Sequence, residues 1–149
     1  AGPVHSGLLE VTTEDGSAVL YVSESTASLK TSWTGDRVKA DITVKAALSV
    51  AEITGFEGQS LDDVFDKLER AAVDHMVALI SKAFEKSFAL NADIFGVGGS
   101  VGRTDPKLWD QIKPDWPDLY PETVLNISAE GVLLESGKIS SALTMKGED

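Results

Sequence analysis

The sequence predicts an α+β fold: an antiparallel β-sheet with one long amphipathic helix packed across it and short helices in the following loop. Three observations lead to this class. Residues 37–53 alternate apolar and polar side chains, residues 61–90 place apolar side chains at helical spacing, and residues 91–121 are rich in glycine and proline. Strand-like segments return after this stretch.

The first two long strands form a hairpin. Residues 17–33 are rich in β-branched and aromatic side chains, and a turn at 34–36 leads into residues 37–53. The second strand has one apolar and one polar face, which is typical of a sheet with one side in water. Its apolar face comprises Val38, Ala40, Ile42, Val44, Ala46, Leu48 and Val50. A further short strand is expected at 7–13.

A helix is expected from Leu61 to about Leu90, with Ser60 as its N-cap. Its apolar stripe follows i, i+3, i+4 spacing. Val73 and Val77 widen that stripe beyond what one sheet face needs. Two interpretations follow: another element of the chain covers this flank, or the flank is exposed for a partner.

The glycine-rich stretch is followed by Asp105 and Pro106, which are typical of a helix start. We also expect a β-bulge at Gly131. The remaining predicted elements are a short helix at 106–112, a further helical turn at 114–121, and strands at 123–136 and 138–145.

The chain has 149 residues, no cysteine and a formal net charge of −11. Its length suggests one domain. We expect residues 15–149 to form it and residues 1–14 to be the tail of a preceding domain or a cloning linker. The acidic excess makes nucleic acid an unfavourable partner and opposes direct adhesion to an anionic membrane. We expect a soluble fragment, because no apolar run approaches the roughly 20 residues that a membrane span needs.

Four glycines fall within seven residues: Gly96, Gly98, Gly99 and Gly102. A dinucleotide-binding loop needs a glycine where Val101 stands, and it follows a strand and opens a helix. We therefore interpret the run as structural. Its glycines would end the long helix in left-handed conformations and allow the backbone to pack closely.

No catalytic, cofactor-binding or metal-binding residue is predicted, and we expect the protein not to be an enzyme. The two histidines, His5 and His75, are isolated from one another. His75 lies near the packed face of the helix, where a lone histidine is usually a core or boundary residue. Neither a zinc-protease motif nor a nucleophile-elbow motif occurs.

Aromatic residues cluster after the long helix, with prolines among them. Proline stiffens a loop at low entropic cost, and exposed Trp and Tyr side chains on a stiff loop suit protein recognition. The same residues can instead form a small satellite core that attaches the loop to the main body. Under the first interpretation, the interaction surface comprises Val73, Val77, Phe95, Trp109, Trp116 and Tyr120.

The order of these features resembles the C-terminal domain of the Ger(x)C family, the C subunits of nutrient germinant receptors in bacterial spores. The resemblance runs from about Gly7 to Gly137. It rests on "ADIFGVG" at 92–98 and on spaced residues of "RTDPKLWDQIKPDWPDLYP" at 103–121. Its most specific parts are Asp93 to Gly96 and Lys107 to Trp116.

Within the first motif, Asp93, Gly96 and Gly98 match the family and are expected to be structural. Val97 departs from the family, which usually has an aromatic residue between these glycines.

The resemblance implies a lipoprotein on the outer face of the spore inner membrane, held by an N-terminal lipid anchor outside this chain. Its partners would be the membrane-embedded A and B subunits, with which it acts in nutrient-triggered germination without a cofactor. Two functions stay open: a protein-interaction module of the receptor, which we favour, and a sensor domain that binds the germinant. The first predicts an exposed apolar patch, and the second predicts a closed pocket with convergent polar groups.

Overall fold

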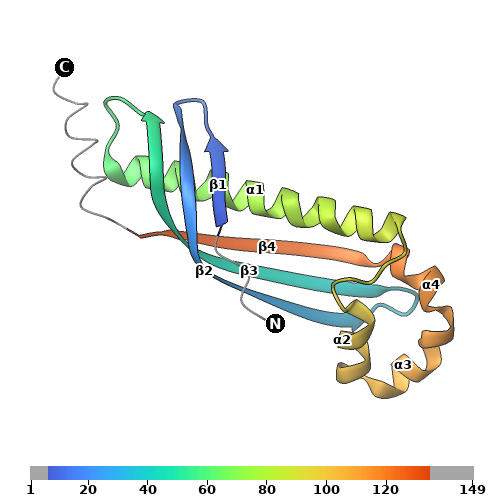
Figure 1. The fold of residues 1–149 in the computed structure, drawn as a ribbon. Coiled ribbons are helices and arrows are strands. Elements are labelled where there is room, and N and C mark those ends of the chain that lie inside the picture. The colour runs from blue at the N-terminus through green and yellow to red at the C-terminus, as the bar shows by residue number, and fades with distance from the viewer. Residues whose placement is uncertain (1–6, 135–149) are drawn as a thin grey trace. The chain divides into compact units, whose positions relative to one another are not determined.

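The computed structural model describes residues 7–134 of the chain. In chain order, a long helix follows the first three strands and precedes the last one (Figure 1). The elements are β1 (Gly7–Thr12), β2 (Gly16–Trp33), β3 (Val38–Gly55), α1 (Leu61–Ala89), α2 (Val97–Thr104), α3 (Pro106–Ile112), α4 (Trp116–Leu119) and β4 (Val124–Leu133), with 3-10 turns at Lys113–Asp115 and Tyr120–Glu122. The α+β class is confirmed, and α2 is an additional helix that the sequence does not predict.

Two predictions concern the ends of the chain. The strand expected at 138–145 lies outside the described residues. The boundary expected at residue 14 stays a prediction, and β1 within that segment pairs with β2.

The four strands follow the order β1-β2-β3-β4. β1 and β2 are antiparallel, with Leu9 opposite Leu20. A tight turn joins β2 to β3, in which the Thr34 amide donates to the Arg37 carbonyl at 2.9 Å. These three strands have the antiparallel arrangement that the sequence predicts.

The pairing of β3 with β4 is parallel, because contacting residues advance together along both strands. The side chains of Asp41 and Asn126 are hydrogen-bonded, as are those of Thr43 and Ser128, and the members of each pair lie 85 residues apart. The sheet is therefore mixed. Parallel neighbours need a long crossover connection, and α1 lies within that connection here.

The bulge expected at Gly131 is absent. Lys45 and Glu130 form an ion pair in the register of the neighbouring pairs, and the Leu134 amide continues that register by donating to the Leu48 carbonyl at 2.8 Å. Glycine serves close packing instead. A Cβ on Gly131 would lie 3.1 Å from Leu48 Cδ1.

Contacts within the chain divide it into two compact units. Within the described residues, the first unit comprises 7–26, 44–76 and 129–134, and the second comprises Ala27–Thr43 and Val77–Ser128. Elements β2, β3, α1 and β4 each supply residues to both units.

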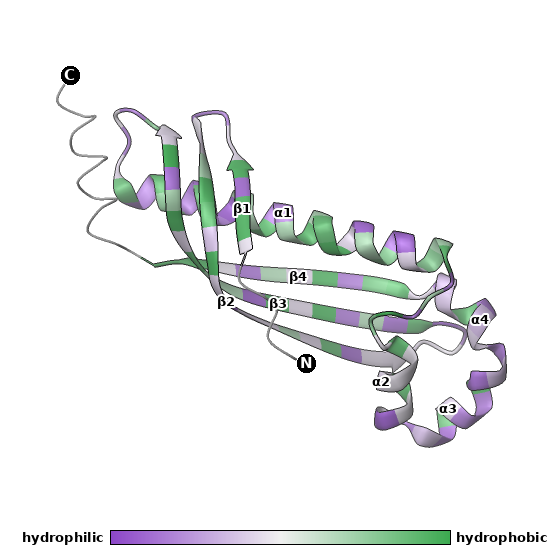
Figure 2. Ribbon diagram, viewed as in Figure 1, coloured by the Kyte–Doolittle hydropathy of each residue, from purple (hydrophilic) through white to green (hydrophobic). Residues whose placement is uncertain are grey.

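The core of the first unit combines one stripe of α1 with apolar strand residues. Val64, Leu68 and Ala72 are four residues apart on the helix and fully buried. Leu20 and Leu48 belong to the same buried cluster. Complete burial of a leucine side chain contributes about 1.5–3 kcal/mol. Figure 2 shows hydrophobic and hydrophilic residues interspersed along α1, as this one-sided packing requires.

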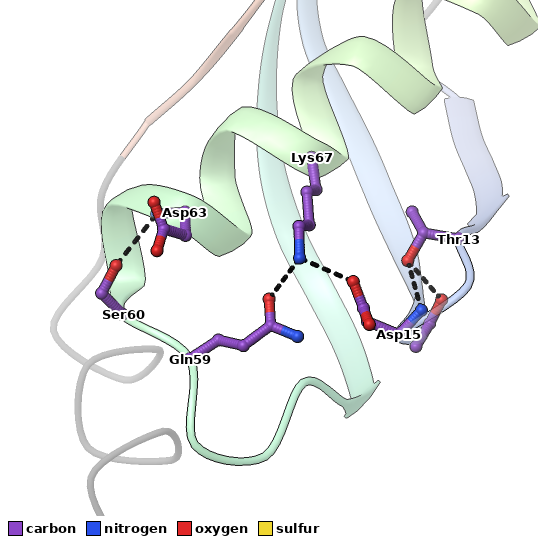
Figure 3. Close-up of polar contacts among 7 residues, drawn as sticks. Thr13, Asp15, Gln59, Ser60, Asp63 and Lys67 are labelled. Atoms are coloured by element: carbon purple, nitrogen blue, oxygen red, sulfur yellow. Dashed lines mark hydrogen bonds and ion pairs between the residues drawn. The ribbon is translucent and has the colours of Figure 1, made fainter.

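The start of α1 follows the prediction. The Ser60 hydroxyl accepts the Asp63 amide at 3.2 Å, which satisfies one of the free amides of the first turn (Figure 3). Ser60 is therefore confirmed as the N-cap.

Candidate functional site

Helix α1 ends at Ala89 before the glycine run begins. Asn91 adopts the left-handed conformation, with a φ of 49°, and its amide donates to the Phe88 carbonyl at 3.0 Å. Asparagine tolerates this conformation because its short polar side chain can hydrogen-bond locally. The prediction that Gly96 to Gly102 end the helix is wrong, since an asparagine turns the chain first.

Three of the four glycines lie inside helix α2, and Gly96 precedes its first residue in a left-handed conformation, with a φ of 72°. The two carboxylate oxygens of Asp93 accept the amides of Val97 (2.8 Å) and Gly98 (2.7 Å). A negative charge at this end of a helix is favourable. The amides that a phosphate would use are therefore occupied by the chain's own aspartate.

The glycines of α2 face two tryptophans. A Cβ on Gly98 would lie 2.8 Å from Trp109 Cη2 and 3.0 Å from Trp116 Nε1. A Cβ on Gly102 would lie 3.2 Å from Trp109 Cδ1. The predicted close approach to the glycine backbone is confirmed, and it is the indole rings that occupy the space.

Six aromatic rings of the second unit form a continuous series of contacts. Phe84 and Phe95 are stacked with their centroids 3.8 Å apart, and Phe88 meets Tyr120 edge-on at 5.0 Å. Aromatic pairs contribute about 0.5–1.5 kcal/mol each beyond their burial. The series connects the proline-rich segment to the end of α1. In order, the rings are Phe95, Phe84, Phe88, Tyr120, Trp116 and Trp109.

Tyr120 lies in the middle of this series and is only 1% exposed. Its hydroxyl lies 2.7 Å from the Ser87 hydroxyl, which itself donates to the Phe84 carbonyl at 2.7 Å. Burial raises the pKa of the Tyr120 phenol above its ordinary value, the Ser87 hydrogen bond opposes this, and the charge of Asp93 adds to it. The expectation that Tyr120 belongs to an interaction surface is wrong, because its ring fills the interior.

The loop after α1 exposes apolar side chains. Ile94 is 72% exposed, Leu90 67% and Phe95 37%, and we call these three residues the apolar tip. The Asn91 side-chain amide donates to the Pro117 carbonyl at 2.7 Å, which attaches the loop to the proline-rich segment. Sequence reasoning included Phe95 but missed Leu90 and Ile94. Their signal is an apolar residue at and beyond the end of the predicted helix.

The other residues predicted to form the interaction surface are less exposed than Ile94 and Leu90. Trp109 and Trp116 are half-buried, with their rings 5.3 Å apart. Val73 and Val77 are also half-buried. In the first unit, Val73 Cγ2 lies 3.9 Å from where a Cβ on Gly131 would be.

The first unit has an open cleft of about 600 Å³ beside the β1–β2 turn and α1. Lys67 lines this cleft. Its ammonium group donates to Asp15 (2.6 Å) and to Gln59 (2.8 Å), as Figure 3 shows. The hydrogen bond from Lys67 is the main cause that lowers the pKa of the Asp15 carboxyl. Arg70 and Asp74 also line the cleft, and neither forms an ion pair within residues 7–134.

Among the described residues, no group of three or more His, Cys, Asp or Glu side chains has an arrangement that could hold a metal ion. None of the helices in residues 7–134 has the combined length and hydrophobicity of a membrane span.

Comparison with known proteins gives two matches. The family model described as "Spore germination B3/GerAC like, C-terminal" matches residues 1–137. Among solved structures, the crystal structure of the GerBC protein matches with a TM-score of 0.77 and 14% sequence identity, over 89% of this chain and 42% of that one. Identity this low supports the fold alone, and the chain spans less than half the length of GerBC. No curated protein matches the chain.

Proposed function

Because the chain belongs to the spore germination B3/GerAC-like C-terminal family, we propose that it is a non-catalytic domain of a germinant-receptor C subunit that contributes contacts to receptor assembly. The proposed partners are the membrane-embedded A and B subunits, which act with it in nutrient-triggered germination. The proposed place is the outer face of the spore inner membrane. A lipid anchor on the full-length protein would hold it there despite the charge of −11.

The apolar tip is the observation that carries this proposal. Ile94 and Leu90 expose most of their side chains, and Phe95 beside them stacks on Phe84. A tip held in place by ring stacking loses little conformational freedom when it binds, so more of its contact energy appears as affinity. Aromatic and aliphatic anchors presented in this way are typical of protein–protein interfaces.

The test replaces Ile94 with aspartate in the full-length C subunit and measures co-purification of the A and B subunits from solubilised spore membranes. Ile94→Asp buries no new charge in the free protein, because the side chain is already exposed. We therefore expect a folded protein that recovers much less of both partners. An aspartate in the contact would leave a charge desolvated and unpaired there.

Leu8→Asp is the matched control. Leu8 is 69% exposed, close to the 72% of Ile94, and it lies on β1 of the first unit. It receives the same change of residue type and should leave co-purification unchanged. Equal recovery of A and B with both variants would remove the apolar tip from the interface, and equal loss with both would show a non-specific effect.

A second candidate function is a sensor for a small germinant. The first unit has an open cleft and not the closed pocket expected for a sensor, and the charges that line this cleft are the observation that favours the candidate. Arg70 and Asp74 supply opposite charges without an ion pair in the described chain, as a zwitterionic amino acid would need. A thermal-shift scan against amino acids and sugars tests it. A ligand at about 100 times its Kd stabilises the folded state by about 2.7 kcal/mol. Arg70→Gln should abolish such a shift, and a panel without any shift would remove this candidate.

A further inference from the structure

The second half of α1 presents basic and apolar side chains in one row. Four residues follow one another at spacings of three or four, which places them on one face of the helix: Leu79, Lys82, Lys86 and Leu90. Leu90 keeps this position beyond the last residue of α1, because its amide donates to the Lys86 carbonyl at 3.1 Å. Leu79 is 52% exposed, Leu90 is 67% exposed, and both lysines are exposed. We call these four residues the basic ridge.

Packing within the second unit does not account for the two lysines of the ridge. The buried face of this half of α1 contains Phe84, which is 1% exposed. Lys82 and Lys86 each lie two positions from Phe84, and two positions correspond to about 200° around a helix. Neither lysine forms an ion pair or a side-chain hydrogen bond within residues 7–134.

The helix dipole accounts for only part of the ridge. Lys86 lies in the last turn of α1, where a cation is favourable. This effect falls off within that turn, so it explains neither Lys82 nor the two exposed leucines.

The ridge differs in charge from most of the chain. The described residues of the first unit contain twelve acidic and three basic side chains, whereas the second unit contains nine acidic and eight basic ones. Between Leu79 and Leu90 the two lysines accompany a single acidic residue, Glu85. An occupant with negative charge is therefore favoured at the ridge.

We propose that the basic ridge binds an acidic amphipathic helix of a partner protein. A row of side chains on one helix packs into the groove of another helix, and this row extends over about 16 Å. The partner helix sets apolar residues against Leu79 and Leu90 and carboxylates against Lys82 and Lys86. Leu90 belongs both to the ridge and to the apolar tip. The inference therefore rests on the proposed function in taking the A and B subunits as the source of this helix.

Two other occupants fit the ridge less well. Helices that lie in a lipid surface bury a broad apolar face, whereas the ridge has two leucines with two lysines between them. In a second copy of this chain, the same row continued toward the start of α1 reaches Ala72 and Leu68, which are fully buried. The acidic first half of α1 therefore offers no matching row.

The test uses the full-length C subunit, below saturation, and measures recovery of the A and B subunits from solubilised spore membranes. Lys82→Gln with Lys86→Gln removes both charges of the ridge. Recovery should fall about three- to tenfold, as expected for two exposed ion pairs. Lys82→Glu with Lys86→Glu should lower recovery further, because glutamate repels an acidic helix.

Lys30→Gln with Lys107→Gln is the matched control. Both lysines are exposed residues of the second unit, and neither forms an ion pair within residues 7–134. The control removes the same charge away from the ridge and should leave recovery unchanged. Equal loss in the control and in the ridge variant would overturn the proposal.

Comparison with Ile94→Asp separates this inference from the proposed function. Loss with Ile94→Asp and normal recovery with both ridge variants would keep the apolar tip as a contact and overturn the basic ridge. Loss with the ridge variants and normal recovery with Ile94→Asp would support the ridge and remove the tip.

Two measurements on the purified chain test the other occupants. Co-sedimentation with vesicles of phosphatidylglycerol and phosphatidylcholine tests a lipid surface, and sedimentation equilibrium tests a second copy. We expect no vesicle binding and no dimer that depends on Lys82 and Lys86. Vesicle binding or a dimer that Lys82→Gln with Lys86→Gln abolishes would overturn the proposal.

Discussion

Packing of the Trp109 and Trp116 rings on helix α2 predicts opposite effects of one substitution at two adjacent glycines. Gly98 and Gly99 both lie in α2, where alanine is intrinsically better than glycine by about 1 kcal/mol. A methyl group on Gly99 would meet only Arg103 Nη1, at 3.4 Å. Gly99→Ala should therefore stabilise the protein by about 0.5–1 kcal/mol.

Gly98→Ala should lose this gain. Its methyl group would lie 2.8 Å from Trp109 and 3.0 Å from Trp116, and both rings are held by further contacts. Overpacking of this kind costs about 1–3 kcal/mol, so the net effect ranges from about neutral to 2 kcal/mol destabilising. The two variants should differ by about 1–3 kcal/mol.

Urea denaturation followed by tryptophan fluorescence measures the difference in stability between the two variants and reports on the unit that contains both glycines. All three tryptophans of the chain belong to the second unit. Equal stabilisation by Gly98→Ala and Gly99→Ala would refute the packing of the indole rings against Gly98.

Three further predictions concern polar groups. Asp93→Asn should destabilise the second unit by about 1–2 kcal/mol, because a neutral amide with one acceptor oxygen replaces a carboxylate that accepts two helix amides. An unchanged urea denaturation midpoint would contradict this capping. The lowered pKa of Asp15 means that its stabilising effect is present above the ordinary aspartate value of about 3.9 and is lost as pH falls through the lowered pKa. Lys67→Met should raise the pKa of Asp15 measured by NMR titration. An unchanged pKa would show that the hydrogen bond from Lys67 to Asp15 does not form in solution. The raised pKa of Tyr120 means that its contribution to stability is present below the ordinary tyrosine value of about 10 and is lost as pH rises through the raised pKa. An alkaline absorbance titration should show one tyrosine ionising above the ordinary pH, and Tyr120→Phe should remove that ionisation. Its persistence in Tyr120→Phe would contradict the burial of this phenol.

Local sequence patterns predict the elements whose stability is largely local. Ser60 and the apolar stripe through Val64, Leu68 and Ala72 identify the start and the buried face of α1 because capping and helical spacing act over a few residues. Helix α2 is different. Four glycines argue against a helix, and only the Asp93 cap and the packing of distant tryptophans overcome their low propensity.

The direction of β4 and the fate of individual aromatic rings also depend on distant partners. Side chains alternate in the same way in parallel and antiparallel strands, so residues 124–133 do not reveal their orientation alone. A tyrosine such as Tyr120 fits both an interface and an interior. The hydrogen bond between its hydroxyl and that of Ser87, 33 positions away, stabilises Tyr120 in the interior.

The proposed contact between the apolar tip and the receptor can be tested by photo-crosslinking in the full-length C subunit. A photoreactive phenylalanine derivative replaces Ile94 in one strain and Leu8 in another, and spore membranes are then illuminated. The proposed function predicts crosslinks to the A or B subunit from position 94 and not from position 8. Crosslinks from position 8 alone, or from neither position in an assembled receptor, would contradict it.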